Sequence, residues 1–201
     1  MAVLLVATTN RGKVAEYNSL LSGLGLELVT LDQAGISQEA EENFDTFTEN
    51  ARSKAIFYAG LSGLLTLADD SGLEVAALGG EPGVRSSRYA GNNASDADRI
   101  SFLLNKLKDV PPEKRQARFK CIIAIASPDG HVETVSGECE GMIALEPRGE
   151  NGFGYDPIFY LPEYGKTIAE IAPGLKNEIS HRSRAARKAR EVLARMLAGK
   201  T

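Results

Sequence analysis

The stretch that decides the fold is Leu65–Val75, with the sequence LTLADDSGLEV. Its apolar first half indicates a buried strand, and two neighbouring carboxylates, Asp69 and Asp70, follow directly. Ser71 and Gly72 predict a turn after them, which would place the carboxylates at the end of a sheet, where α/β proteins commonly bind ligands. Because successive strand side chains point to opposite faces, one carboxylate is expected to act and the other to support it. A plain turn that only ends a strand is the alternative.

The composition is that of an ordinary globular chain. Of the 201 residues, 43% are hydrophobic and 25% are charged, and the formal net charge is −4. These values predict one domain over residues 1–201 and argue against a broad nucleic-acid-binding surface. No apolar run approaches the roughly 20 residues of a membrane span, and the first residues lack a basic signal-peptide segment, so we expect a cytoplasmic protein without a membrane partner. Cys121 and Cys139 lack metal-site spacing and are expected to be buried without a chemical role.

A polar turn follows the first expected strand, Val3–Thr8. Residues Thr9–Lys13 (TNRGK) lead into a segment with helical periodicity. The free N–H groups at a helix start and the charge of Lys13 make this turn a candidate phosphate site. It is not a Walker A loop, because Ala7 stands at the position of the first glycine and Val14 follows the lysine. An ordinary solvated turn is the alternative.

A helix is expected over Phe47–Ala59, after an acidic segment at residues 32–45. Asn50 and Lys54 lie one turn apart on it, away from its apolar stripe. The acidic segment and Lys54 are most simply solvated surface. Lys54 becomes functionally relevant only if its face of the helix points towards Asp70.

The second half of the chain combines a hairpin with two glycine-rich loops. Strand patterns at residues 118–127 and 132–136 are joined by a Pro-Asp-Gly turn, so His131 is expected to be exposed beside it. A further strand at residues 142–145 is expected to prolong the hairpin. The long loop at residues 76–91 is of a kind that is more often functional than idle.

Two aromatic residues lie in the second glycine-rich loop, residues 149–157. Exposing Phe153 and Tyr155 would be costly, so stacking of a flat base on one ring is a candidate role, contributing about 1–3 kcal/mol per base. The alternative is that both rings pack beneath the loop. The glycine spacing does not fit a dinucleotide fingerprint. The Arg-rich helix that follows Lys176–Arg182 is expected to have a solvated basic surface.

Together these motifs resemble the inosine triphosphate pyrophosphatase family over nearly the whole chain. The motifs that carry the resemblance are Thr8–Lys13, the acidic segment before Thr46–Ala51, Ala68–Gly72, Gly79–Gly83 with Ser87–Tyr89, Phe153–Asp156 and Ser180–Arg182. The resemblance implies an α/β fold with an elongated mixed β-sheet flanked by helices, and two lobes with a central substrate cleft. It also implies a cytosolic homodimer that uses Mg²⁺ to cleave ITP, dITP and XTP to the monophosphate and pyrophosphate, cleansing the nucleotide pool.

The resemblance also implies residue roles. Asp70 would bind Mg²⁺ together with Glu41 and orient or deprotonate the attacking water, although nothing in the residues themselves separates Glu41 from Glu42. The residues expected at the triphosphate are Thr8, Thr9, Asn10, Arg11, Gly12, Lys13, Lys54 and Ser71. The residues expected at the base are Phe153, Gly154, Tyr155, Asp156, Lys176, His181 and Arg182.

Two positions depart from the family pattern. Thr9 stands where many members have Gly, and Asn43 and Phe44 replace a common Thr-Gly pair in the acidic segment. Two rival functions remain open. One is a pyrophosphatase for modified pyrimidine nucleotides, and the other is a nucleotide sensor without catalysis.

Overall fold

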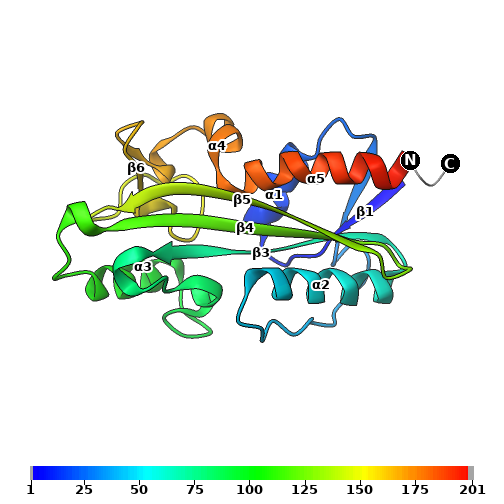
Figure 1. Ribbon diagram of the computed structural model, residues 1–201, viewed down its shortest axis with the longest axis horizontal. Coiled ribbons are helices and arrows are strands. Elements are labelled where there is room, and N and C mark those ends of the chain that lie inside the picture. Colours follow the sequence, from blue (N-terminus) through cyan, green and yellow to red (C-terminus); the bar gives the residue numbers. More distant parts are fainter. Residues whose placement is uncertain (1, 199–201) are drawn as a thin grey trace. The chain divides into compact units, whose positions relative to one another are not determined.

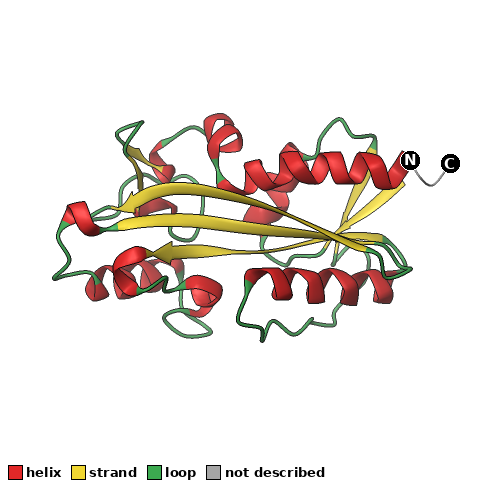
Figure 2. Ribbon diagram, in the orientation of Figure 1, coloured by secondary structure: helices red, strands yellow, loops and turns green. Residues whose placement is uncertain are grey.

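The computed structural model describes residues 2–198 and contains a seven-stranded mixed sheet with helices against it (Figures 1 and 2). The strand order is β2-β1-β3-β4-β5-β6-β7. The strands are β1 Ala2–Val6, β2 Leu26–Thr30, β3 Leu65–Val75, β4 Gln116–Ala126, β5 Val132–Ile143, β6 Phe159–Leu161 and β7 Lys166–Thr167. The helices are α1 Arg11–Leu20, α2 Phe47–Ser62, α3 Asp96–Lys106, α4 Pro173–Ile179 and α5 His181–Ala198. The expected mixed sheet flanked by helices is confirmed.

The pairing directions follow from the connections. β1 pairs in parallel with β2 and with β3, and helices α1 and α2 occupy the connections. β6 pairs antiparallel with β5 and with β7. Parallel neighbours require a crossover, which a helix commonly supplies, whereas antiparallel neighbours need only a short turn. The first half of the chain is therefore the part that resembles a doubly wound sheet.

The chain divides into two compact units, and neither is one continuous stretch. The first contains residues 2–70, 121–137 and 182–198 of the described chain, and the second contains residues 71–120 and 138–181. Strands β3, β4 and β5 contribute residues to both units.

In the first unit, helices lie on both faces of the strands. Figure 1 shows α1 and α5 on one side of β3 and β4, and α2 on the other. The core on the α1 and α5 side joins Tyr17, Leu67, Ile123 and Leu193, each fully buried. Val192, the residue before Leu193 on α5, belongs to the same core.

Helix α2 is built as its sequence predicts. Phe47, Ala51, Ala55 and Ala59 form its buried stripe. The Thr46 hydroxyl accepts a hydrogen bond from the N–H of Glu49 at 3.2 Å and so satisfies one of the free donors at the helix start. The helix runs to Ser62, three residues beyond the expected Ala59.

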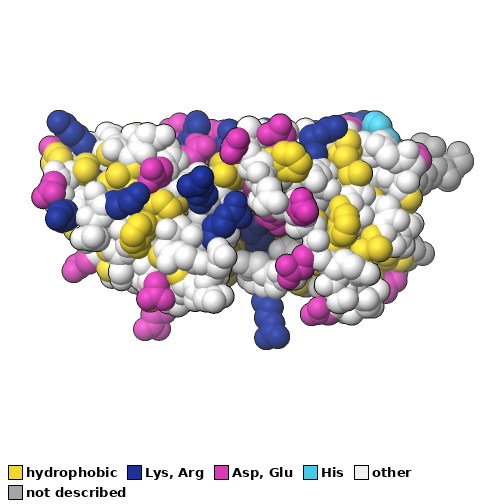
Figure 3. All heavy atoms as spheres, turned by 90° about the horizontal axis from the view of Figure 1, so that it is seen from below, with side chains coloured by type: hydrophobic (Ala, Val, Ile, Leu, Met, Phe, Trp, Pro, Cys, Tyr) yellow, Lys and Arg dark blue, Asp and Glu magenta, His cyan; other side chains and the backbone are white. Residues whose placement is uncertain are grey.

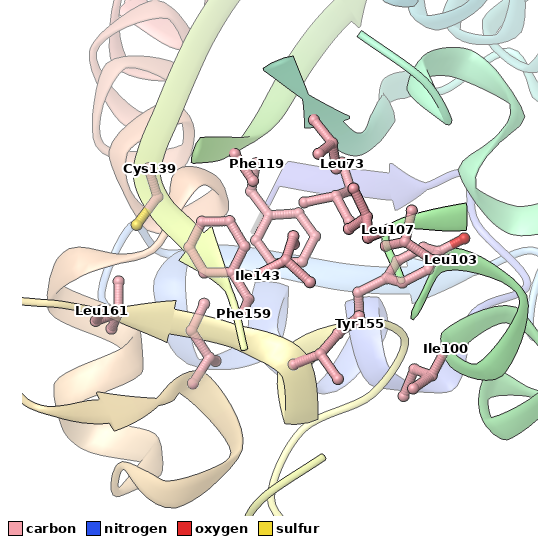
Figure 4. Close-up of a cluster of buried hydrophobic side chains, with 14 of the residues drawn as sticks. Leu73, Ile100, Leu103, Leu107, Phe119, Cys139, Ile143, Tyr155, Phe159 and Leu161 are labelled. Atoms are coloured by element: carbon pink, nitrogen blue, oxygen red, sulfur yellow. The ribbon is translucent and has the colours of Figure 1, made fainter. Parts of the chain in front are cut away.

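The second unit has its own hydrophobic core, shown in Figure 4. Leu103 and Leu107, at the end of α3, pack with Phe119, Tyr155 and Phe159. The rings of Phe119 and Phe159 have centroids 4.4 Å apart. This core anchors the second glycine-rich loop, because Tyr155 belongs to both the loop and the core.

The prediction that Ser71 and Gly72 turn the chain is wrong, because β3 continues from Leu65 to Val75. Gly72 does not adopt a positive φ, which a turn at glycine commonly uses. The strand continues because Leu73 and Val75 are fully buried in the second core. Likewise β5 is one strand, where two strand segments were expected.

The expectations for the two cysteines and for His131 are confirmed. Cys121 and Cys139 are buried and form no disulfide, and the His131 side chain is 60% exposed, as predicted. Within residues 2–198, no helix combines the length and the apolar character needed to cross a bilayer. On the face shown in Figure 3, basic and acidic side chains are interspersed with small apolar patches.

Candidate active site

Asp69 and Asp70 lie in the middle of β3 and point to opposite faces of the sheet. Asp69 contacts groups from α1 and α5, whereas Asp70 contacts a residue of α2. Both carboxylates are buried, with 1% and 8% of their surface exposed. The expectation that the two side chains diverge is therefore confirmed, although the strand does not end at them.

The polar turn after β1 lies beside Asp69 because of the parallel register. Val6 is paired with Leu67, and the N–H of Ala7 donates to the Leu67 carbonyl at 2.8 Å. The next residues of both strands therefore run side by side, which brings the start of α1 to Asp69. This one strand pair brings together Lys13 and Asp69, which are more than 50 residues apart in the sequence.

Local hydrogen bonds start α1 at the predicted turn. The Thr8 hydroxyl accepts from the N–H of Asn10 at 3.2 Å, and the Asn10 side chain accepts from the N–H of Lys13 at 3.1 Å. Asn10 is thus the N-cap residue, and Lys13 lies in the first turn. Thr9, Asn10 and Arg11 are exposed, so the turn is accessible to a ligand.

Two cations hold Asp69 ionised. The Lys13 ammonium lies 2.8 Å from its Oδ2, and the Arg182 guanidinium lies 3.8 Å from the same atom. Burial acts to raise the pKa of Asp69, but the charges of Lys13, Arg182 and Lys54 outweigh it and hold this pKa well below its usual range. Glu16 binds the Arg182 guanidinium at 2.5 Å. Asp69 therefore organises cations on its face of the strand.

Asp70 is held by a neutral donor. The Asn50 amide donates to its Oδ2 at 3.0 Å. Burial raises the pKa of Asp70 to about 6, against the opposing attraction of Lys13 and Lys54 and the hydrogen bond from Asn50, and with the repulsion of Glu42 in support. Asp70 is thus a carboxylate that exchanges a proton near neutral pH in the substrate-free protein.

Lys54 points into this cluster and is buried, not solvated. Only 8% of the residue is exposed, and its ammonium lies 2.8 Å from the Glu42 carboxylate. Burial acts to lower the pKa of Lys54, but attraction to Glu42, and then to Asp69 and Asp70, raises it overall. The condition under which Lys54 becomes functionally relevant is therefore met.

A neutral pair lies behind Asp69. The Cys121 thiol is 3.9 Å from Asp69 Oδ2 and 4.0 Å from the Tyr17 hydroxyl. Burial and then the charge of Asp69 raise the pKa of Cys121 to about 12, and the pKa of Tyr17 is also raised, by the same two causes. Both groups stay uncharged at neutral pH, so Cys121 is a packing residue and not a nucleophile.

The carboxylates around Asp70 have the chemistry that a hard divalent cation prefers. The charge of Glu42 raises the pKa of Asp70, and a bound cation would relieve this repulsion. Mg²⁺ commonly uses one or two carboxylates together with phosphate oxygens and water. Glu41 is exposed, whereas Glu42 is half-buried against Lys54. Within residues 2–198, no group of three or more His, Cys, Asp or Glu side chains is placed so that it could hold a metal ion.

In the second unit, three of the residues expected at the base lie together. The Lys176 ammonium is 2.6 Å from the Asp156 carboxylate and 4.9 Å from the centroid of the Phe153 ring. The same carboxylate accepts from the N–H of Phe153 at 2.9 Å. Gly152 has φ +82°, and a Cβ there would collide with Asp156, so this close approach requires glycine. Phe153 remains half-buried.

The two aromatic residues of this loop have different environments. Tyr155 is 4% exposed, packs in the second core and donates its hydroxyl to the Ser86 carbonyl at 2.9 Å. Its side chain therefore packs beneath the loop, the arrangement given by the sequence analysis as the alternative for both rings. The N–H of Gly154 donates to Asp96 at 2.7 Å, which fastens the loop to the start of α3.

The last residues expected at the base are divided between the units. His181 is 5% exposed, and its ring is stacked on Phe119 with centroids 4.7 Å apart in the second unit. Arg182, the next residue, belongs to the first unit and is bound there by Glu16 and Asp69. Ser71 is half-buried and is the first residue of the second unit on β3.

Sequence reasoning missed Glu16 and assigned no role to Asn50, although both shape the site. Glu16 lies one helical turn after Lys13 on α1, and a charged residue at that spacing is a usable signal. Asn50 is 1% exposed in the middle of α2, where Asn is unfavourable unless its side chain is bonded. A buried Asn within a predicted helix is therefore the signal that points to its role.

Comparisons with known proteins agree on one family. The pattern that describes the Ham1 family matches residues 4–192. A dITP/XTP pyrophosphatase of Desulforamulus reducens is 49% identical over 193 residues, covering 96% of both chains, and one of Geobacter sulfurreducens is 50% identical over 185 residues. The solved structure of a HAM1 protein from Coxiella burnetii superimposes with a TM-score of 0.88 and 44% identity, and covers 97% of this chain and all of that one.

Proposed function

Because the chain belongs to the Ham1 family, we propose that it is a pyrophosphatase that hydrolyses the non-standard purine nucleotides dITP, XTP and ITP. The products are the nucleoside monophosphate and pyrophosphate. Relatives that carry the name dITP/XTP pyrophosphatase and cover nearly the whole chain support this substrate class. We further propose that the protein is a cytoplasmic homodimer.

The single observation that carries the proposal is the environment of Asp70. Its carboxylate accepts a hydrogen bond from Asn50, lies in the field of Lys13 and Lys54, and has a pKa of about 6 in the metal-free protein. A general base is most effective when its pKa lies near the working pH. Asp70 therefore accepts the proton of the water that attacks the α-phosphorus, and pyrophosphate is the leaving group.

Cations and turn donors stabilise the phosphates. Lys13 and Lys54 neutralise the negative charge that develops on the phosphate oxygens, and such preorganised charge is commonly the largest catalytic contribution. The helix start at Thr8, Thr9, Asn10, Arg11 and Gly12 positions the triphosphate, and Ser71 adds a hydrogen bond. Asp69 keeps Lys13 at this position through their 2.8 Å ion pair.

We propose Asp70 and Glu41 as the protein ligands of Mg²⁺, since Glu42 is already bound by Lys54. Bound Mg²⁺ supplies positive charge at the phosphate oxygens. Replacing each glutamate in turn by Gln distinguishes the two neighbours. The true ligand is the one whose loss raises the Mg²⁺ concentration required for half-maximal rate.

The loop cluster of the second unit is proposed to bind the base. Phe153 stacks on the purine, while Asp156, Lys176 and His181 bind its edge, with Gly154 and Tyr155 contributing backbone groups. A donor that faces the 6-oxo group of hypoxanthine or xanthine would face the 6-amino group of adenine. Such a mismatch costs about 1–3 kcal/mol per buried contact.

The decisive experiment measures pyrophosphate release from dITP with Mg²⁺ and again with EDTA. Metal-dependent release is expected, and its absence would leave a nucleotide sensor as the better explanation. Parallel assays with ITP, XTP, ATP and methylated pyrimidine triphosphates define the base. Faster turnover of the pyrimidine triphosphates would indicate the rival function, a pyrophosphatase for modified pyrimidine nucleotides.

A further inference from the structure

The side chain of Asn50 is the point where the acidic segment and Asp70 are joined. Its Oδ1 accepts from the N–H of Phe44 at 3.1 Å, and its Nδ2 donates to the Phe44 carbonyl at 3.2 Å. The same Nδ2 donates to Asp70 Oδ2 at 3.0 Å. Both Nδ2 hydrogens and the carbonyl oxygen of this amide are thus engaged.

These bonds determine the orientation of the Asn50 amide. Turning the amide by 180° would place its oxygen against the Phe44 carbonyl and the Asp70 carboxylate, and its NH₂ against the N–H of Phe44. All three contacts would then be repulsive, so the amide donates to Asp70. Because only the backbone of Phe44 takes part and its side chain is 43% exposed, the unusual residue at position 44 does not disturb this arrangement.

Asn50 is one of three residues of α2 that bind residues 38–44 of the acidic segment. Tyr58 donates to the Gln38 carbonyl at 3.1 Å and accepts from the N–H of Ala40 at 3.2 Å. Lys54 holds Glu42 at 2.8 Å. The three residues are spaced by four along the helix and so lie on one face. Tyr58 supports only the segment, whereas Asn50 also bonds to Asp70.

We infer that Asn50 is a positioning residue for the hydrolysis, which fixes the direction of the Asp70 carboxylate and couples it to the acidic segment. With Oδ2 held, the carboxylate keeps one rotamer, and its proton-accepting geometry is already formed before the substrate binds. Catalysis loses rate when such a group is free to rotate, because the productive geometry is populated for less time. This inference rests on the proposed function.

The test compares Asn50→Leu, which keeps the size but removes every hydrogen bond, with Tyr58→Phe, which loosens the acidic segment but does not touch Asp70. For dITP at saturating Mg²⁺, we expect Asn50→Leu to lower kcat by about 10–100-fold with KM within about threefold of the wild type. Tyr58→Phe is expected to keep kcat within about threefold. A raised KM with unchanged kcat in Asn50→Leu, or equal losses in both variants, would overturn the inference.

A second arm tests whether Asn50 acts through Asp70. In an Asp70→Asn background, adding Asn50→Leu is expected to change the residual rate by less than about threefold, because residues that act as a unit are not additive. A further loss as large as in the wild-type background would show that Asn50 acts elsewhere.

A third measurement does not depend on activity or on the folding of Asn50→Leu. The side-chain amide resonances of Asn50 are recorded by NMR in the wild type, in Asp70→Asn and in Tyr58→Phe. We expect a larger shift in Asp70→Asn, which changes a direct partner of the amide, than in Tyr58→Phe, which removes only the bonds to Gln38 and Ala40. A shift in Asp70→Asn no larger than that in Tyr58→Phe would contradict the contact. If the wild type does not hydrolyse dITP, the proposed function fails while this measurement still decides whether Asn50 binds Asp70.

Discussion

Two adjacent carboxylates on opposite faces of β3 have pKa values shifted in opposite directions. Asp69 is the more deeply buried of the two, yet its pKa is held low, whereas the pKa of Asp70 is raised to about 6. Burial opposes ionisation of both. The difference lies in their partners, because Asp69 is in direct contact with a cation while Asp70 receives a hydrogen bond from a neutral amide. The direct partner, and not the depth of burial, decides which carboxylate can exchange a proton.

Under the proposed function, this contrast gives the two residues different tasks. A carboxylate that stays ionised serves as a structural counter-ion for Lys13 and Arg182. A carboxylate with a pKa near neutrality serves as a proton acceptor. The strand separates the tasks because its side chains alternate between faces.

The largest expected effect is on turnover. Replacing Asp70 by Asn removes the proton acceptor and should lower kcat for dITP by about 10²–10⁴-fold, with dITP binding retained. Asp69→Asn keeps the proposed proton acceptor, Asp70, and should lower kcat by a smaller factor. Pyrophosphate release and equilibrium binding of dITP measure both variants. Equal losses in the two variants would remove the functional difference between the faces.

The next effect is on stability, where Asp69→Asn is expected to lose more than Asp70→Asn. Asp69→Asn leaves the buried Arg182 and the partly exposed Lys13 without their shared carboxylate. Breaking such a pair should cost about 3 kcal/mol of unfolding free energy. Glu16 still compensates Arg182, which limits the loss. Urea unfolding at pH 7 provides the measurement. A variant as stable as the wild type would show that Asp69 is dispensable for folding.

The pH dependence of stability should separate the two carboxylates. The raised pKa of Asp70 means that the folded protein binds its proton more tightly than the unfolded chain, so stability is present at low pH and is lost as pH rises through about 6. The low pKa of Asp69 has the opposite sign, because its contribution is present above the ordinary carboxyl pKa and is lost as pH falls below it.

Without substrate or metal, Asp70→Asn should therefore match the wild type near pH 4 and be more stable at pH 8, by up to about 3 kcal/mol. Urea unfolding at the two pH values gives this difference. A gain that does not grow with pH would mean that Asp70 is already compensated in the free protein.

The smallest expected effect is at Cys121, which lies behind Asp69. Its contact of 3.9 Å is long, and its pKa of about 12 keeps it neutral. Cys121→Ser should therefore change kcat by less than about threefold, since a buried thiol of this kind acts as a small packing group. A tenfold loss would show that the thiol sets the charge state of Asp69.

In the loop of the second unit, Phe153 and Tyr155 also differ because their contacts differ, although they are both aromatic and lie two positions apart. Tyr155 is held by the core and by Ser86, while Phe153 stays half-buried beside Lys176. Phe153→Ala should weaken binding of dITP by about 1–3 kcal/mol and leave binding of free triphosphate unchanged. Competition assays with both ligands make the comparison, and equal weakening of both would place the Phe153 ring in the structure of the loop.

Sequence patterns alone determined the elements whose signals are local. The apolar stripe of α2, the helix that follows the turn at Thr9–Lys13 and the exposed hairpin residue His131 each depend on neighbours within a few residues. The motif order also indicated the family. These features could be read from the chain because helix periodicity and capping are short-range effects.

Tertiary structure decided everything that depends on partners far along the chain. β3 continues past Ser71 because Leu73 and Val75 enter a second core, which no local turn signal reveals. Likewise Asp69 and Asp70 are chemically equivalent in the sequence. Their charge states differ because β1 pairing brings Lys13 to one face, and α2 packing brings Asn50 to the other. A pKa is set by the distances to charges and donors, and those distances exist only in the folded chain.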